Sequence, residues 1–346
     1  FIFSPQVESA MVKLLVVIAA FVAVNVRGEE SGTYPLLMPN VRPEQPESYF
    51  CTPIKIDDEK TYFVVGFDPN ATMVTAHHML IYGCEKPGSD AAVWNCGEMA
   101  GGQRGLKSAP PCRDGSQVVY AWAKDAPPLE LPRGVGFRVG KNTEISYLVL
   151  QVHYASVEKF KDGSTDDSGV FLRYTDQPQP KTAGVLLMGT GGVIGPKSTT
   201  HMESACRIDE DKVIHPFAFR VHTHALGQVV SGYRVRLGNA YANFDWTLIG
   251  KKDPQLPQMF YPVNDSEMII KKGDVVASRC TMHNNRWRIV TVGPTNNHEM
   301  CNFYLMYWVD GEHPLAKKKC FTLGPPLFYW SRFPLTNIPD EDASTL

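Results

Sequence analysis

The chain has 346 residues, of which 43% are hydrophobic and 20% charged, and its formal net charge is -2. This composition is typical of globular proteins and excludes a disordered chain, and the length is sufficient for two medium-sized domains. Because no basic stripe runs along the sequence, we expect no nucleic acid partner.

The N-terminus has the features of a secretory signal peptide. Met11 and Lys13 precede an apolar run over residues 14–24. This run is too short to span a membrane, because a spanning helix needs roughly 20 apolar residues. We therefore interpret residues 1–30 as leader and signal peptide, and place the protein in the secretory pathway, in a secretory granule lumen or outside the cell. The polar tail at 338–346 carries no apolar run, so we expect no stable membrane anchor.

Eight cysteines are present, and in a secreted chain we expect them to form disulfides. They are Cys51, Cys84, Cys96, Cys112, Cys206, Cys280, Cys301 and Cys320. Four lie in each half of the chain, which indicates two separately stapled domains, although the spacing leaves the pairing open. No pair has the C-x-x-C spacing of a zinc ribbon. Sequons at Asn70 and Asn264 are compatible with a secreted glycoprotein.

Short runs of β-branched and aromatic residues, separated by Gly and Pro, make up most of the remaining chain. They lie at 61–67, 118–122, 147–154, 184–188, 217–221, 228–235, 274–278 and 303–309. Many short strands between turns predict an all-β protein with antiparallel β-sandwich or jelly-roll architecture. The polar, Pro-rich segment at 175–180 divides the cysteines evenly, so we expect tandem domains at 31–178 and 179–346.

Three histidines of the first half are candidate metal ligands. His77 and His78 are adjacent, and adjacent side chains on a flat strand face opposite ways. Both can reach one ion only if the backbone bends or bulges there. His153, at the end of the predicted strand 147–154, is available as a third ligand. The alternative is that all three are surface or structurally bonded histidines.

A second candidate set lies in the other half. His222 and His224 are two residues apart on a predicted strand, so their imidazoles share a face and can converge on one metal. Met300 offers a thioether beside Cys301. A thioether combined with imidazoles indicates copper, above all Cu(I), with zinc as the alternative metal. The plainer interpretation is a pair of exposed strand histidines and a core methionine.

Together these features resemble the peptidylglycine alpha-hydroxylating monooxygenase family, from about residue 48 to residue 320. The matching stretches are His77-His78-Met79-Leu80, then residues 120–123, 131–140, 151–154, 220–224, 229–236, 246–250, 254–258 and 299–302. The resemblance implies two jelly-roll domains with one copper each. It also implies hydroxylation of the C-terminal glycine of peptides at its alpha carbon, with ascorbate as reductant and O2 as co-substrate. This reaction is the first step of peptide C-terminal amidation, as in neuropeptide processing.

The resemblance assigns the ligands of each copper. The electron-transfer copper of the first domain would be bound by His77, His78 and His153. The copper that meets dioxygen, in the second domain, would be bound by His222, His224 and Met300. A thioether favours Cu(I), the form that reacts with dioxygen.

The resemblance maps the peptide carboxylate onto Arg220, Asn302 and Tyr304. The sequence pattern agrees, because Arg220 lies two residues before His222 and shares its strand face. Asn302 and Tyr304 have the same parity as Met300.

Gln151 is a further candidate, because it shares a strand face with His153 and its amide can lie between the two coppers. The alternative is an ordinary hydrogen-bonded strand residue.

The resemblance further implies disulfides between Cys51 and Cys96, Cys84 and Cys112, Cys206 and Cys320, and Cys280 and Cys301. The sequence departs from the family pattern at Tyr82, often Phe, at Ser168, near an expected cysteine, and at Ala225, often a third histidine. The lyase domain of bifunctional relatives is missing, so we expect a separate lyase to act on the product. We expect a monomer.

Three other interpretations remain open. A dopamine beta-hydroxylase-like enzyme would keep the copper ligands but would act on an amine and would not need Arg220. A secreted copper-binding protein would hold the metal without catalysis. A purely structural disulfide-rich sandwich would bind no stoichiometric metal.

Overall fold

The computed structural model describes residues 30–97, 108–238, 243–293 and 297–346. The predicted leader and signal peptide lies, apart from its last residue, outside this described part. The described chain consists mainly of β-strands, with one 3-10 turn (Glu158–Asp162) and one short helix, α1 (Asp340–Ser344). The all-β prediction is therefore confirmed. Within the described ranges, no helix is long and apolar enough to cross a membrane.

The first half of the chain forms two packed sheet regions. One contains β1 (Ser31–Leu37), β12 (Gly169–Thr175), β3 (Thr61–Asn70), β10 (Val135–Gly140) and β9 (Leu129–Glu130). The other contains β6 (Trp94–Asn95), β2 (Ser48–Lys55), β11 (Tyr147–Tyr154), β4 (His78–Cys84) and β8 (Gln117–Ala123). A short ribbon is formed by β5 (Lys86–Pro87) and β7 (Cys112–Asp114). The two regions meet in a core where Phe67 stacks on Tyr120 with ring centroids 4.4 Å apart.

The second half repeats this two-layer plan. One layer contains β13 (Lys181–Thr190), β23 (Cys301–Asp310), β16 (Val213–Thr223), β19 (Tyr261–Pro262), β20 (Ile270–Lys271) and β24 (Lys319–Thr322). The other contains β15 (Ser198–Arg207), β21 (Val275–Asn284), β17 (Gly227–Leu237) and β18 (Phe244–Lys252). A small ribbon pairs β14 (Val193–Ile194) with β22 (Val290–Thr291).

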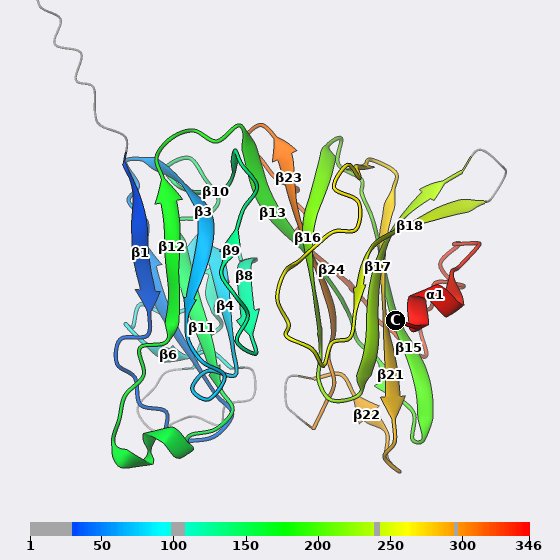
Figure 1. Ribbon diagram of the computed structural model, residues 1–346, viewed down its shortest axis with the longest axis horizontal. Helices are drawn as coiled ribbons and strands as arrows, with labels where there is room; N and C mark the ends of the chain where they lie inside the picture. Colours follow the sequence, from blue (N-terminus) through cyan, green and yellow to red (C-terminus); the bar gives the residue numbers. More distant parts are fainter. Residues whose placement is uncertain (1–29, 98–107, 239–242, 294–296) are drawn as a thin grey trace, which may run out of the picture.

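The two halves lie side by side and share one sheet (Figure 1). A short parallel pairing joins β10 to β13, where Val135 lies opposite Lys181, so an 11-stranded sheet runs through both halves. The predicted boundary at 175–180 falls between β12 and β13. Apolar residues of the second half, including Phe260 and Met306, belong to the core cluster of the first half. The interface therefore has an apolar, packed centre.

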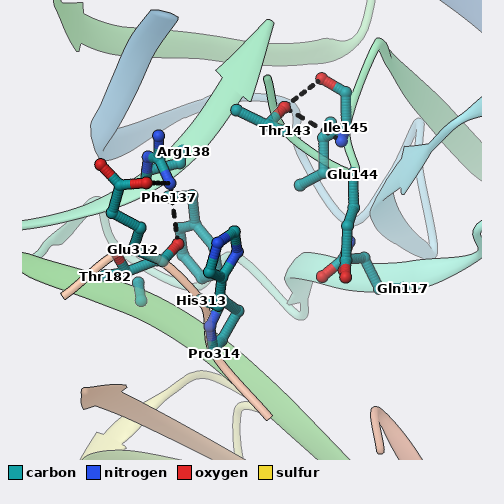
Figure 2. Close-up of a pocket in the computed structure, with 11 residues that line it drawn as sticks. Gln117, Phe137, Arg138, Thr143, Glu144, Ile145, Thr182, Glu312, His313 and Pro314 are labelled. Carbon is teal, nitrogen blue, oxygen red and sulfur yellow. Dashed lines mark hydrogen bonds and ion pairs between the residues drawn. The ribbon is translucent and has the colours of Figure 1, made fainter. Parts of the chain in front are cut away.

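A small cavity lies near this junction and is drawn in Figure 2. Arg138 donates a hydrogen bond of 2.9 Å to the Glu312 carbonyl on one side, and Glu144 and Gln117 lie on the other. Its volume is about 30 Å³. Such a space holds a water molecule and not an organic ligand.

Three of the four predicted disulfides are present in the structure. They are Cys51–Cys96, Cys84–Cys112 and Cys280–Cys301. The fourth prediction is wrong for this structure, because Cys206 and Cys320 are unbonded, buried thiols. They meet as a hydrogen-bonded pair, and the bond to Cys206 together with burial raises the pKa of Cys320.

The C-terminal segment packs on the sheet of β15, β21 and β17, where Figure 1 shows α1. Trp330 is fully buried and its indole donates to the Ser204 carbonyl at 2.9 Å. Beside it, Arg279 forms a buried ion pair with Glu203 and a second pair with Asp340 of α1.

The buried pair predicts a marked loss of stability when one partner is removed. Arg279→Leu leaves the Glu203 carboxylate buried without its partner, which costs about 3 kcal/mol or more. We expect the Tm from circular dichroism to fall by roughly 10 °C. The double variant Glu203→Leu/Arg279→Leu removes both charges and should recover much of this loss. A double variant no more stable than the single variant would contradict the assignment.

Candidate active site

The backbone bends where the first histidine group requires it. A turn over residues 73–75 and a bend at His77 precede β4, which begins at His78. The His77 amide donates to the His153 carbonyl at 2.9 Å, and β4 and β11 pair His78 with His153. The bend turns His77 toward the other two rings, so adjacent histidines face one centre.

The three imidazoles converge through the same ring nitrogen. The Nδ1 atoms of His77 and His78 are 3.4 Å apart, as are those of His78 and His153. One nitrogen from each ring lies within 4.8 Å of the others. Nitrogens bound to one ion at about 2.0 Å stand roughly 3.3–3.5 Å apart. The spacing therefore fits a single metal ion held by three imidazoles.

The surroundings keep His77 and His78 neutral and orient all three rings. Burial, with repulsion from His153, lowers the pKa of His77 to about 4 and that of His78 well below its usual value. Neutral imidazole is the form that binds metals. His153 Nε2 lies 2.8 Å from a carboxylate oxygen of Glu47 and its ring stacks on Tyr49. A proton on Nε2, donated to Glu47, leaves the Nδ1 lone pair directed at the cluster.

The second histidine pair uses the opposite ring nitrogen. His222 lies near the end of β16, His224 follows it, and their ring centroids are 5.4 Å apart. His222 Nδ1 lies 2.7 Å from Oε1 of Gln258, and His224 Nδ1 lies 3.1 Å from the His298 carbonyl. Both acceptors require a proton on Nδ1, so Nε2 of each ring is the available metal ligand. Burial lowers the pKa of His222 well below its usual value.

Met300 is positioned by the start of β23. The register pairs His222 with Asn302 and Thr223 with Cys301. Met300 immediately precedes this pairing on one strand, and His224 immediately follows it on the other. Its sulfur lies 3.9 Å from the Asn302 amide nitrogen.

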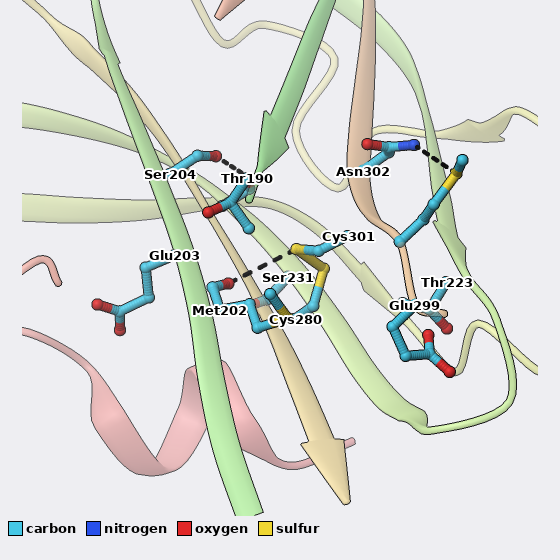
Figure 3. The surroundings of a disulfide bond; sticks show 12 residues. Thr190, Met202, Glu203, Ser204, Thr223, Ser231, Cys280, Glu299, Cys301 and Asn302 are labelled. Carbon is cyan, nitrogen blue, oxygen red and sulfur yellow. Dashed lines mark hydrogen bonds between the residues drawn. A yellow bond between two sulfur atoms is a disulfide. The ribbon is translucent and has the colours of Figure 1, made fainter. Parts of the chain in front are cut away.

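Two restraints hold this end of β23 (Figure 3). The Cys280–Cys301 disulfide ties it to β21. The buried Glu299 carboxylate accepts the amides of His224 and Leu226 at 2.9 and 2.8 Å. The Met300 thioether and the two imidazoles thus come from the adjoining ends of β23 and β16, and such a donor set suits Cu(I).

Arg220 lies beside this second group, in the interior. It is 2% exposed, it pairs with Tyr304 across β16 and β23, and its guanidinium lies 5.0 Å from the Tyr304 ring. Nε donates to the Gln258 carbonyl at 2.8 Å and Nη2 to the Gln258 side chain at 3.3 Å. No carboxylate of the described residues forms an ion pair with it. A guanidinium has five N–H groups, so donors remain for an acid.

Sequence reasoning missed the role of Gln258. Its side-chain oxygen contacts both His222 and Arg220, and its amide donates to two backbone carbonyls. It thus links the metal group to the guanidinium. The only sequence signal was its place in the matching stretch 254–258.

Gln151 has the contacts of a hydrogen-bonded strand residue. Its amide nitrogen lies 3.3 Å from the Cys96 carbonyl, and its oxygen accepts from Tyr82 at 3.5 Å. Its placement between two coppers stays a prediction.

The two histidine groups face each other across the domain interface. The rings of His78 and His222 are 6.3 Å apart between centroids. Lys124 of the first half donates to the Gln255 carbonyl of the second at 2.8 Å nearby. Sequence reasoning identified both groups but not their separation.

The fold and these donor sets agree with a comparison against protein families. Residues 34–161 match the N-terminal domain of the copper type II ascorbate-dependent monooxygenases, and residues 181–333 match the C-terminal domain. The chain belongs to this family of copper-containing oxidoreductases, which use ascorbate and O2.

Among individual proteins, the chain is similar to peptidyl-glycine alpha-amidating monooxygenase A of Xenopus laevis, with 42% identity over 315 residues, covering 90% of this chain and 32% of that protein. The similarly named protein of Mus musculus is 41% identical over 86% of this chain and 29% of its own length. Dopamine beta-hydroxylase of Rattus norvegicus is 26% identical over 74% of this chain and 41% of its own length. The chain spans about a third of the length of the first two relatives.

The hydrogen-bond partners of the two groups predict separable effects on metal affinity. Gln258→Leu frees the His222 ring and should weaken copper at the second group about 10- to 100-fold, leaving the first unchanged. Glu47→Gln should instead weaken copper binding at the first group and leave the second group unchanged. Titration of the metal-free protein with Cu(I) against a competing chelator measures both. If both variants lowered the copper affinity of the same group, Gln258 and Glu47 would not support separate groups, and the assignment would be contradicted.

Proposed function

We propose that the protein hydroxylates the alpha carbon of the C-terminal glycine of peptides and releases peptidyl-alpha-hydroxyglycine, the first step of C-terminal amidation. The observation that carries this proposal is the buried guanidinium of Arg220, which lies on β16 two residues before His222. A buried cation without a carboxylate partner is costly unless a ligand supplies one. Two relatives, both named as peptidyl-glycine alpha-amidating monooxygenases, point to the same chemistry.

The spacing fits a terminal glycine. Arg220 and His222 are two residues apart on β16, about 6.7 Å along the strand. A carboxylate bound to the guanidinium places its own alpha carbon between the two side chains. Asn302 and Tyr304, which face them on β23, supply further polar contacts. The protein thus orients one C–H bond toward the second metal group, which lowers the entropic part of the barrier.

We assign His77, His78 and His153 to an electron-transfer copper. We assign His222, His224 and Met300 to the copper where oxygen reacts. The metals supply the redox chemistry, in which two electrons from ascorbate allow one atom of O2 to enter the glycine and the other to leave as water.

An amine substrate is the competing proposal, favoured by the 26% identity to dopamine beta-hydroxylase. An amine carries no carboxylate and would place a second cation near Arg220. The guanidinium therefore favours a peptide acid over an amine.

We further propose domains at 31–178 and 179–346, a monomeric protein of the secretory pathway and a lyase reaction that consumes the product. Of the two sequons, Asn264 is exposed, whereas the Asn70 amide contacts the Asp167 carbonyl at 3.4 Å. Asn264 is the better candidate for a glycan.

The carboxylate assignment predicts a specific kinetic defect. With copper, ascorbate and O2 present, Arg220→Ala should raise the KM for an acyl-peptide ending in glycine about 10- to 100-fold, because charged hydrogen bonds are lost. The wild-type protein should discriminate similarly against the C-terminal amide of that peptide. Product is measured by mass spectrometry. Arg138→Ala, which removes an arginine outside the site, is the matched control and should leave KM unchanged. An unchanged KM in Arg220→Ala would remove this residue from the substrate site.

A further inference from the structure

Phe321 is an exposed aromatic residue in register with the proposed substrate site. On β24 it pairs with Gly189 of β13, and Gly189 pairs with Asn302 of β23. Asn302 in turn pairs with His222 of β16. Because cross-strand partners share a face of the sheet, His222, Asn302, Gly189 and Phe321 form one row across four strands on the same face.

Because Gly189 has no side chain, the Phe321 ring can lie over this position, close to the proposed substrate site. The Phe321 ring fills the space in which a Cβ atom at position 189 would stand, and Asn302 Oδ1 lies 3.0 Å from the same point. The ring edge and the Asn302 amide are therefore separated by only a few ångströms. Even so, Phe321 is 60% exposed, and Leu323 beyond it is 70% exposed. The exposed Phe321 ring therefore lies next to Asn302, one of the proposed carboxylate contacts.

The distances suit the residue that precedes the glycine. Adjacent strands are about 4.8 Å apart, and one extended peptide residue spans about 3.4 Å. With the glycine held at Arg220 and Asn302, the preceding residue lies over or beside Gly189. Its side chain then meets the Phe321 ring.

We propose that Phe321 contacts the side chain that precedes the C-terminal glycine of the peptide and makes the enzyme prefer an apolar or aromatic residue there. This inference rests on the proposed peptide substrate. The physical basis is burial of the exposed ring and aromatic contact with the substrate side chain. Gly189 is the positioning residue, because any side chain there would displace the ring.

The test compares two substrates, acetyl-Phe-Gly and acetyl-Gly-Gly, on the copper-loaded protein. Phe321→Ala should lower kcat/KM for acetyl-Phe-Gly about five- to tenfold, mainly through KM. It should change kcat/KM for acetyl-Gly-Gly less than about twofold, since that peptide has no side chain to reach the ring. Gly189→Ala, which displaces the ring, should act in the same direction. Phe321→Leu should retain most of the preference.

Trp287→Ala is the matched control, because Trp287 is an 87% exposed aromatic residue outside the row. It should leave the ratio of the two kcat/KM values unchanged. Hydroxylation of both peptides with an unaltered ratio in Phe321→Ala would overturn this inference and leave the proposed function standing. Failure of the wild-type protein to hydroxylate either peptide would overturn both.

Discussion

The register of β16 against β23 determines the geometry of the second half of the site. The register places Asn302 opposite His222 and Tyr304 opposite Arg220, so the proposed metal ligand and the proposed substrate contacts lie on the same face of the sheet. A slip of one residue would turn each of these side chains to the other face of the sheet. The Cys280–Cys301 disulfide and the Glu299 hydrogen bonds hold the strand end where such a slip would begin.

The shared sheet extends this constraint to the first half. The β10–β13 pairing joins the two sandwiches, which pack through an apolar cluster, and the centroids of the His78 and His222 rings are 6.3 Å apart. Burial at that interface lowers the pKa of both rings. The same exclusion of water makes an unpaired guanidinium at Arg220 a strong attraction for a carboxylate. The proposed metal sites and the proposed carboxylate site thus depend on one packing arrangement.

Much of the site was predictable because strand parity is a local property. The two-residue spacing of His222 and His224, and of Arg220 and His222, predicts a common face without knowledge of the fold. The adjacent His77 and His78 required a bend, and the structure contains it. Three disulfides followed from the family resemblance.

The remaining features depend on contacts between distant segments, which alternation does not encode. The link from Gln258 to Arg220 and His222 joins a loop to β16. The packed tail depends on a buried Arg279 that reads in the sequence as an ordinary charged residue. The contact between the Cys206 and Cys320 thiols joins β15 to β24, two strands far apart in the sequence. The sheet that joins the two halves rests on a two-residue parallel pairing too short to leave a sequence pattern.

The central claim is that the paired histidine groups insert oxygen into a terminal glycine. It is tested most directly by supplying the copper-loaded protein with ascorbate, a glycine-extended peptide and dioxygen labelled with oxygen-18. We predict one labelled atom on the alpha carbon of the glycine, located by fragmentation mass spectrometry, and none in a reaction without copper. An unmodified peptide, or an oxygen atom derived from water, would contradict the account.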